Sequence, residues 1–259
     1  MESHMRATAF EFRRRFWTIC LTYLVGFGFY AVDHVNVVEA LARWIFSKSD
    51  PHLNSLDASH FIHGLFVLSA MLVTATAWVR TWGGAYLLQE VVHDSAVHTE
   101  RLVADGPYRH VRNPLYFGNM LLAVGMAMLA SRTGAVVIIL GNLLIVLRLI
   151  GREEADLTAA QGDGYRAFLA AVPRLWPSLR PCLPAGGMQP KWFQAFLGEA
   201  WMWSFALDGF VFAWKLSGRL YDIILCVCGV AYYVMWMMLG RFRSRNFPPT
   251  APGQPSPQP

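Results

Sequence analysis

The chain has 259 residues, 55% of them hydrophobic, and carries a formal net charge of +5. This composition excludes a disordered chain, and the long apolar runs exclude an ordinary soluble domain. The basic residues lie at the ends of these runs, which argues against nucleic acid as a partner. The four cysteines imply no disulfide framework, and neither Cys226-x-Cys228 nor His60-x-x-His63 forms a convincing metal site, so we expect no metal.

Apolar runs set the fold class. A run of roughly 20 residues crosses the hydrocarbon core of a membrane as a helix. Such runs lie near residues 16–36, 60–79, 114–130, 134–150, 193–214 and 219–239. We therefore predict an all-α, polytopic integral membrane protein with about six transmembrane helices, or five if the run 193–214 is interfacial or re-entrant.

The basic residues also predict an orientation. With the N-terminus in the cytoplasm, five of the 22 lysines and arginines fall outside, namely Arg43, Lys48, Arg132, Lys215 and Arg219. This asymmetry is the positive-inside rule for an even number of crossings. We expect both termini in the cytoplasm, in a bacterial inner membrane or, in a eukaryote, the endoplasmic reticulum.

Breakers and polar loops divide the chain into four parts. These are an N-terminal transmembrane hairpin (1–80), a core (81–181), a C-terminal aromatic-rich transmembrane pair (182–247) and a disordered tail (248–259). The core begins with an interfacial segment from Gly83, continues as a helical hairpin over 114–150, and ends with a cytoplasmic helix broken near Gly162.

Residues 106–118 (GPYRHVRNPLYFG) form a basic, turn-forming segment that runs directly into an apolar run. Asn113 and Pro114 have the positions of an N-cap and a first helical residue. The same geometry offers free backbone N–H groups and a positive helix end to a carboxylate. Tyr108 and Tyr116 either attract a cation with their rings or belong to an interfacial aromatic belt. The segment predicts a polar site at the cytoplasmic face.

A second cluster, Arg152-Glu153-Glu154, lies at the polar end of the next apolar run. The two arms of the hairpin are similar in length, so both clusters should end at the same depth. An acidic residue there either starts a solvated helix or binds an ammonium group or ribose hydroxyls. S-adenosylmethionine carries a carboxylate, an ammonium, a sulfonium and a ribose, so it suits the two clusters together.

Two motifs in the same order and spacing resemble the isoprenylcysteine carboxyl methyltransferase and phospholipid methyltransferase superfamily. The first comprises Gly106, Tyr108, Arg112, Asn113, Pro114, Tyr116 and Gly118. The second comprises Glu153, Glu154, Leu157, Gly162, Tyr165, Val172 and Pro173. The resemblance covers residues 93–177 and implies an integral membrane enzyme that uses S-adenosylmethionine as methyl donor, bound in a pocket at the cytoplasmic face.

The resemblance also implies site residues. The expected cofactor contacts are His93, Glu100, Arg101, Leu102, Val103, Tyr108, Asn113, Pro114, Leu115, Tyr116 and Glu153. We assign Arg112, Glu153 and Glu154 to catalysis. Two departures matter: Asn113 replaces the usual histidine and cannot titrate, and Leu149 stands where the carboxyl methyltransferases have an arginine. The second departure weighs against a prenylcysteine-like carboxylate substrate.

We expect the enzyme to methylate a lipophilic small molecule or lipid that enters from the bilayer. The group that accepts the methyl group is a carboxylate, an amine or a thiol. An amine acceptor would need a proton acceptor such as Glu153, Glu154 or His110. Candidate substrate residues are Arg148, Arg152, Glu199 and Asp208, because intramembrane charges are costly and often functional. Glu199 and Asp208 would instead reach water if their segment is interfacial. We interpret Trp201 and Phe205 as packing aromatics.

Two other classes of protein remain open. A membrane reductase of the sterol-reductase type shares an Arg-His-Pro-x-Tyr-like motif but uses NADPH. A non-enzymatic membrane protein, such as a scaffold or transporter, would need neither ligand. A transporter would show helix breaks at midmembrane in paired segments, and the central hairpin shows none convincingly.

Overall fold

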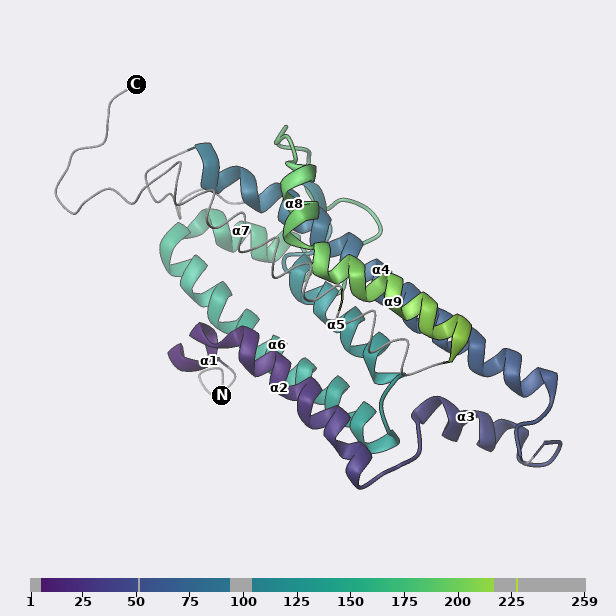
Figure 1. Cartoon of the computed structure of the whole chain (residues 1–259). Coiled ribbons are helices and arrows are strands. Elements are labelled where there is room, and N and C mark those ends of the chain that lie inside the picture. Colours follow the sequence, from purple (N-terminus) through teal and green to yellow (C-terminus); the bar gives the residue numbers. More distant parts are fainter. Residues whose placement is uncertain (1–5, 51, 94–103, 217–226, 228–259) are drawn as a thin grey trace.

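The computed structural model describes residues 6–50, 52–93, 104–216 and 227. This part of the chain is all-helical (Figure 1). Its α-helices are α1 (Ala9–Arg13), α2 (Arg15–Gly28), α3 (Val37–Phe46), α4 (Leu56–His93), α5 (Pro114–Ala127), α6 (Arg132–Gln161), α7 (Asp163–Ala171), α8 (Trp192–Gly198) and α9 (Ala200–Lys215). Two 3₁₀ turns, η2 (Phe29–Ala31) and η3 (Gly106–Arg109), complete it.

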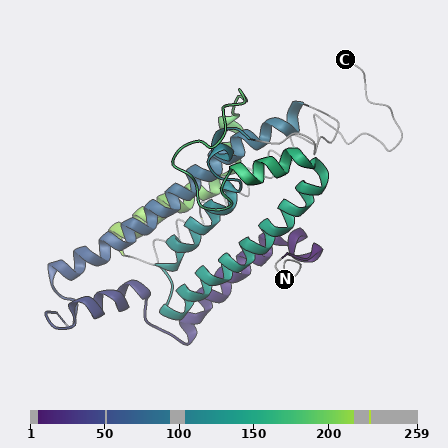
Figure 2. The same ribbon diagram turned by 180° about the vertical axis from the view of Figure 1, so that it is seen from behind.

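The long helices run side by side in an elongated bundle (Figures 1 and 2). One group pairs α2 with α6, and the other sets α5 and α9 along α4, with α5 also packed on α6. Residues Leu56–Leu87 of α4 and the whole of α6 are long and apolar enough to cross a membrane, and α5 is a shorter apolar helix. The apolar run 219–239 and the tail 248–259 lie outside the described residues, except for residue 227.

The predicted crossing at 60–79 and the first part of the predicted interfacial segment from Gly83 belong to one helix. Helix α4 continues without a break from Leu56 to His93. Gly83 and Gly84, which suggested a boundary, instead allow close packing: a Cβ at Gly83 would lie 3.1 Å from Leu115, and one at Gly84 would lie 3.7 Å from Ala195. The glycines mark contacts of this helix with its neighbours rather than its end.

The helices of the predicted N-terminal hairpin, residues 1–80, have different packing partners. Helix α2 packs on α6, whereas α4 packs on α5 and α9. Polar contacts join α2 to α6, because the Asn142 side-chain amide donates to Thr22 Oγ1 at 2.9 Å. Between α2 and α4 lies α3, an unpredicted helix capped by Asn36, whose side chain accepts from Val38 N at 2.8 Å.

Helices α2 and α6 approach each other most closely at Gly26 and Gly134. A Cβ on Gly134 would collide with the carbonyl oxygen of Gly26, and one on Gly26 would collide with Ile138. In a bilayer, where lipid tails are as apolar as leucine, such close packing and interhelical hydrogen bonds stabilise the helix pair. The pair of glycines therefore explains why α2 selects α6 as its partner.

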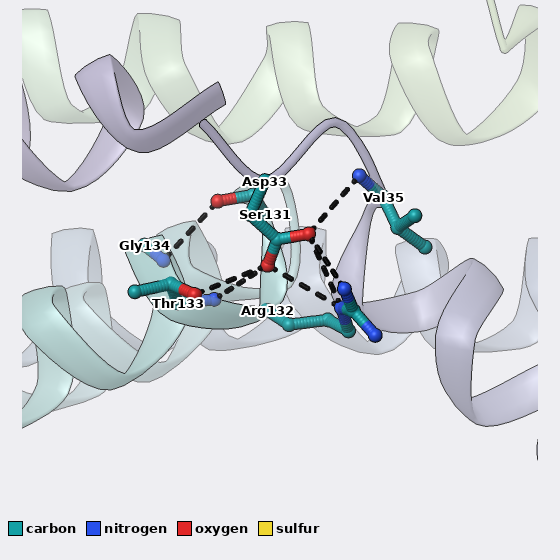
Figure 3. A network of polar contacts seen from close by, with 6 residues as sticks. All are labelled: Asp33, Val35, Ser131, Arg132, Thr133 and Gly134. Carbon is teal, nitrogen blue, oxygen red and sulfur yellow. Dashed lines mark hydrogen bonds and ion pairs between the residues drawn. The ribbon is translucent and has the colours of Figure 1, made fainter. Parts of the chain in front are cut away.

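Asp33 ties the loop after α2 to the start of α6 (Figure 3). Its carboxylate accepts from Arg132 Nη2 at 3.0 Å, from the Thr133 backbone N–H at 3.0 Å and from the Thr133 hydroxyl at 3.2 Å. Ser131 caps α6 by accepting from Gly134 N at 3.2 Å. The hydrogen bond from Arg132, followed by that from the Thr133 N–H, holds the pKa of Asp33 far below its usual range.

We expect Asp33→Asn to lower the thermal unfolding midpoint of the detergent-solubilised protein at pH 7. A carboxylate with a depressed folded-state pKa stabilises the fold above its unfolded pKa of about 4 and loses this effect as the pH falls through the folded value. The difference between wild type and variant should therefore shrink below about pH 4. Asp163→Asn, which removes an exposed ion pair, is the matched control. A difference that does not change with pH would contradict this role.

We expect Gly134→Ala to destabilise the fold by about 1–3 kcal/mol, because overpacking forces two backbones apart. Gly28→Ala is the control, since a Cβ at Gly28 meets nothing within 4 Å and the residue has helical φ and ψ. Thermal unfolding in detergent measures both variants. Equal stability of the two variants would show that the close approach of α2 and α6 is not required.

Candidate functional site

The basic motif forms the 3₁₀ turn η3, which leads into α5. Asp105 caps the turn by accepting from Gly106 N at 3.1 Å, and its other oxygen accepts from Met188 N at 2.9 Å. Gly106 has φ +56°, and a Cβ there would collide with the Tyr86 ring. Both the backbone and the neighbouring ring therefore require glycine at this position. Tyr108 is 8% exposed, so its side chain is enclosed in the turn.

Residues 173–183, which we call the strap, run along this turn. Backbone hydrogen bonds join the two segments: Arg112 N donates to Pro173 O (2.9 Å), Ser178 N to His110 O (2.9 Å) and Cys182 N to Arg109 O (2.8 Å). The His110 ring is engaged as well, because its Nδ1 lies 2.9 Å from Ser178 O. His110 is also absent from the lining of the cavity described below, so its position does not support the expectation that it accepts a proton from a substrate.

The two charged clusters meet across the hairpin of α5 and α6. Glu154 Oε1 accepts from Asn113 Nδ2 at 3.2 Å and lies 3.5 Å from Arg112 Nη1. Glu154 Oε2 lies 3.1 Å from Arg174 Nε in the strap. The side chains of Glu154 and Arg112 are each 13% exposed. Glu154 thus has both oxygens engaged and joins the motif, the hairpin and the strap.

Asn113 and Pro114 begin α5, but the asparagine does not cap it with its side chain. Asn113 has the N-cap position and makes no side-chain cap hydrogen bond, and Pro114 is the buried first residue. The Asn113 amide donates instead to Glu154 and to Arg174 O at 3.0 Å. Its role is to hold the clusters together, which an uncharged amide does without titrating.

Tyr165 lies behind the cluster on α7, which folds back from α6 at Gly162 with φ +60°. It is 3% exposed and packs with Phe168 and Val172. Burial, with a smaller contribution from Glu154, raises the pKa of Tyr165 to about 12. The phenol is therefore protonated at neutral pH and supports the fold rather than acting as a base.

Glu153 points to the other side of α6 and faces a cavity. The cavity has a volume of about 630 Å³ and is enclosed by α2, α4, α5, α6 and α9. Its polar lining residues are Arg15, Tyr23, Arg80, Tyr116, Asn119 and Glu153, and its apolar ones are Phe16, Ile19, Cys20, Leu115, Leu122, Met126, Trp201 and Phe205. Tyr116 interacts with Glu153 through its hydroxyl. We call the part lined by Arg15, Tyr116 and Glu153 the polar wall, whereas Tyr23, Arg80 and Asn119 belong to the remaining, mainly apolar lining.

The structure divides the predicted cofactor and catalytic residues into three groups. Leu115, Tyr116 and Glu153 line the cavity, whereas Arg112, Asn113 and Glu154 lie outside its lining and contact each other. Tyr108 and Pro114 are buried in the turn and at the start of α5. The predicted contacts Glu100, Arg101, Leu102 and Val103, and the His93 side chain, lie outside the described residues.

The predicted substrate residues separate as well. Arg148 pairs with Glu11 at 2.9 Å, and Arg152 lies 3.4 Å from Asp156 and over the Phe12 ring, so both hold the N-terminal segment on α6. Asp208 is 1% exposed on α9 and does not line the cavity. Glu199 differs from these, because it pairs with Arg80 at the cavity wall. Its side chain is 14% exposed, so it does not reach bulk water.

Sequence reasoning missed most of the cavity. The sequence does contain a signal for two of its residues, although we did not predict them. Arg80 is a charge just beyond an apolar run, and Asn119 is a polar residue inside one. Tyr23 and Cys20 on α2 carried no such signal. Trp201 and Phe205, which the sequence assigns to packing, form part of the lining.

Comparison with protein families finds one match over the motif region. Residues 63–159 match the isoprenylcysteine carboxyl methyltransferase (ICMT) family. No curated protein and no solved structure matches the chain. The matched region contains α5, most of α6, the contacting residues Asn113 and Glu154, and the cavity residue Glu153, and it favours a methyltransferase over a reductase or a non-enzymatic protein. Residues 63–159, which are 97 of the chain's 259 residues, are therefore similar to the ICMT family of integral membrane methyltransferases that use S-adenosylmethionine.

Proposed function

We propose that the cavity binds S-adenosylmethionine at its polar wall and a lipophilic acceptor along its apolar walls, and that the acceptor enters from the bilayer. The observation that carries this proposal is the position of Glu153. It is the motif glutamate that faces the cavity, whereas Glu154 is held by its neighbours. With this end of the bundle in the cytoplasm, as the positive-inside rule predicts, a water-soluble cofactor and a lipid reach the cavity from different sides.

The residues at the polar wall fit the cofactor. The carboxylate of Glu153, with the Tyr116 hydroxyl beside it, suits an ammonium group or ribose hydroxyls. Arg15, exposed at the start of α2, suits a carboxylate. A volume of about 630 Å³ lies within the usual range for small-molecule sites. The bound cofactor would supply a methyl group on a sulfonium, and Arg15, Tyr116 and Glu153 would hold and orient it.

The remaining walls fit an apolar chain. Ile19, Leu122, Met126 and Phe205 are among the side chains that line them. Helix α2 separates the cavity from the outside, and its outer face exposes Trp17, Leu21 and Leu24, with exposed fractions of 65%, 55% and 73%. Exposed apolar side chains on a candidate membrane helix are the surface that lipid covers. An acceptor dissolved in the bilayer therefore reaches the cavity past α2.

The chemistry needs little beyond positioning. Holding a donor and an acceptor in line lowers a barrier by about 7–11 kcal/mol. A carboxylate acceptor needs no base, whereas an amine must lose a proton before it attacks. Glu153 is the carboxylate that faces the cavity, so it is the group that would take this proton. Glu154 is paired with Arg112 and Arg174, and neither Glu154 nor His110 lines the cavity.

We expect Glu153→Gln to weaken S-adenosylmethionine binding about tenfold or more, because hydrogen bonds to charged groups contribute about 1.5–3 kcal/mol. Calorimetry on the detergent-solubilised protein measures this affinity. Glu154→Gln, one residue away, should mainly lower stability, since it removes both ion pairs of a largely buried carboxylate that is 13% exposed. Asp156→Asn, on the exposed side of the same helix, is the control. An unchanged affinity in Glu153→Gln would contradict the cofactor role of this residue.

We expect purified protein to transfer radiolabel from S-adenosylmethionine to a molecule in host lipid extract. The label should be found in the organic phase, and its release by mild base would identify a methyl ester, whereas stable label would indicate an amine or thioether. Protein carrying Glu153→Gln should transfer far less label at the same cofactor concentration. Label confined to the aqueous phase would contradict a lipophilic acceptor.

A further inference from the structure

A guanidinium stands in the wall of the cavity, on an otherwise apolar stretch of α4. Arg80 donates from Nε and Nη2 to the two oxygens of Glu199, at 2.8 Å and 2.9 Å. It also donates from Nη1 to Asn119 Oδ1 at 2.8 Å. The side chains of Arg80 and Glu199 are 18% and 14% exposed. Two helices, α4 and α5, and the junction of α8 and α9 thus meet at one planar group.

The contacts leave part of this group unused. A guanidinium has five N–H donors, and the described residues accept from three of them in Arg80. One donor remains on each terminal nitrogen. Asn119 turns its carbonyl oxygen to Arg80, so its amide N–H groups are the donors left to face the cavity that it lines. This part of the wall therefore presents N–H donors.

The pair with Glu199 determines how these donors behave. A lone guanidinium in apolar surroundings is costly, and a carboxylate in bidentate contact compensates its charge. The planar fork also fixes the orientation of the group before any ligand arrives. Replacement of such a pair by apolar side chains is often neutral or stabilising, so a gain in stability does not by itself account for it. The arrangement has the features of a preorganised binding group.

Arg80 and Asn119 lie next to the polar wall at which we place the cofactor. Asn119 follows Leu115 and Tyr116 on α5 by four and three residues, which places all three on one face of the helix. The donors of Arg80 and Asn119 therefore lie between the wall of Tyr116 and Glu153 and the aromatic side chains Trp201 and Phe205 of α9.

We propose that Arg80, with Asn119 beside it, binds the oxygen-bearing polar end of the lipophilic acceptor, and that Glu199 is the residue that positions Arg80. The inference rests on the proposed function, because it assigns the acceptor to this cavity. Arg80 and Asn119 present N–H donors to the cavity that they line, so a carboxylate, carbonyl or hydroxyl oxygen is favoured and an ammonium is disfavoured. Glu199 lies beyond residues 63–159, so the chain outside the matched region completes the site.

Binding tests the inference without requiring methyl transfer. The probes are a long-chain carboxylic acid with two bromine atoms on its chain and the primary amine of the same chain. Bromine quenches tryptophan fluorescence, and Trp201 lines the cavity. The difference between each protein and its Trp201→Phe version isolates this site from the other tryptophans. Wild type should bind the acid more tightly than the amine.

Variants of the pair separate binding from structure. The double variant Arg80→Gln/Glu199→Gln leaves no unpaired charge and should bind the acid about tenfold more weakly, with amine binding nearly unchanged. Glu199→Gln alone keeps an oxygen for Arg80 and removes a competing negative charge, so it should bind the acid at least as tightly as wild type. If the pair were merely structural, both variants would bind both probes more weakly, and this result would overturn the inference. A preference of the wild type for the amine would overturn it as well.

Kinetics provide a second readout. In the labelling assay, the double variant should raise the apparent KM for lipid extract about tenfold and leave S-adenosylmethionine affinity unchanged. Asp33→Asn/Arg132→Gln, which removes an ion pair at the other end of the bundle, should lower stability without changing this KM. An unchanged KM in the double variant would overturn the role of Arg80. Absence of transfer by wild type would instead contradict the proposed function, while the binding experiment would still test Arg80.

Discussion

One carboxylate determines how the site is organised. Glu154 contacts Arg112 and Asn113 at the start of α5 and Arg174 in the strap, so the motif turn, the helical hairpin and the strap form one unit. Successive residues of a helix point about 100° apart, so Glu153 must then face a different side. That side is the cavity. The two adjacent glutamates therefore have different roles: Glu154 stabilises the fold, and Glu153 is free to contact a ligand in the cavity.

The helices around this unit are held by polar groups and close approach. Ser69 donates to Gly125 O at 2.7 Å, and Thr76 donates to Gly118 O at 3.1 Å, where α4 and α5 pack closely. Asn142 performs the same task between α6 and α2. In lipid, such contacts replace the hydrophobic effect as the source of helix association. The cavity persists between the two groups of helices because each group is secured by its own contacts.

Part of this arrangement could be predicted from the sequence. The apolar runs locate α5 and α6, because a helix long enough for a membrane has a clear signature in composition. Pro114 at the first helical position and the break at Gly162 follow from local backbone preferences. The motifs lead to Leu115, Tyr116 and Glu153, three of the cavity residues.

The rest depends on which helices become neighbours, and an apolar run does not encode that. The partner of α2 is set by one glycine contact and one amide, which are invisible to a hydrophobicity pattern. Arg80 marks the end of an apolar run in the sequence, yet in the structure it lies within α4 and is compensated by Glu199 from far along the chain. The sequence likewise does not distinguish Glu153 from Glu154, whereas in the structure Arg174 forms an ion pair with Glu154.

A structure of the protein bound to S-adenosylhomocysteine tests the central claim most directly. The account predicts that the ligand contacts Glu153 and Tyr116 at the cavity wall, with the contacts of Glu154 to Arg112 and Arg174 intact. Ligand density that displaces Arg112 or Arg174 from Glu154 and makes no contact with Glu153 would contradict it.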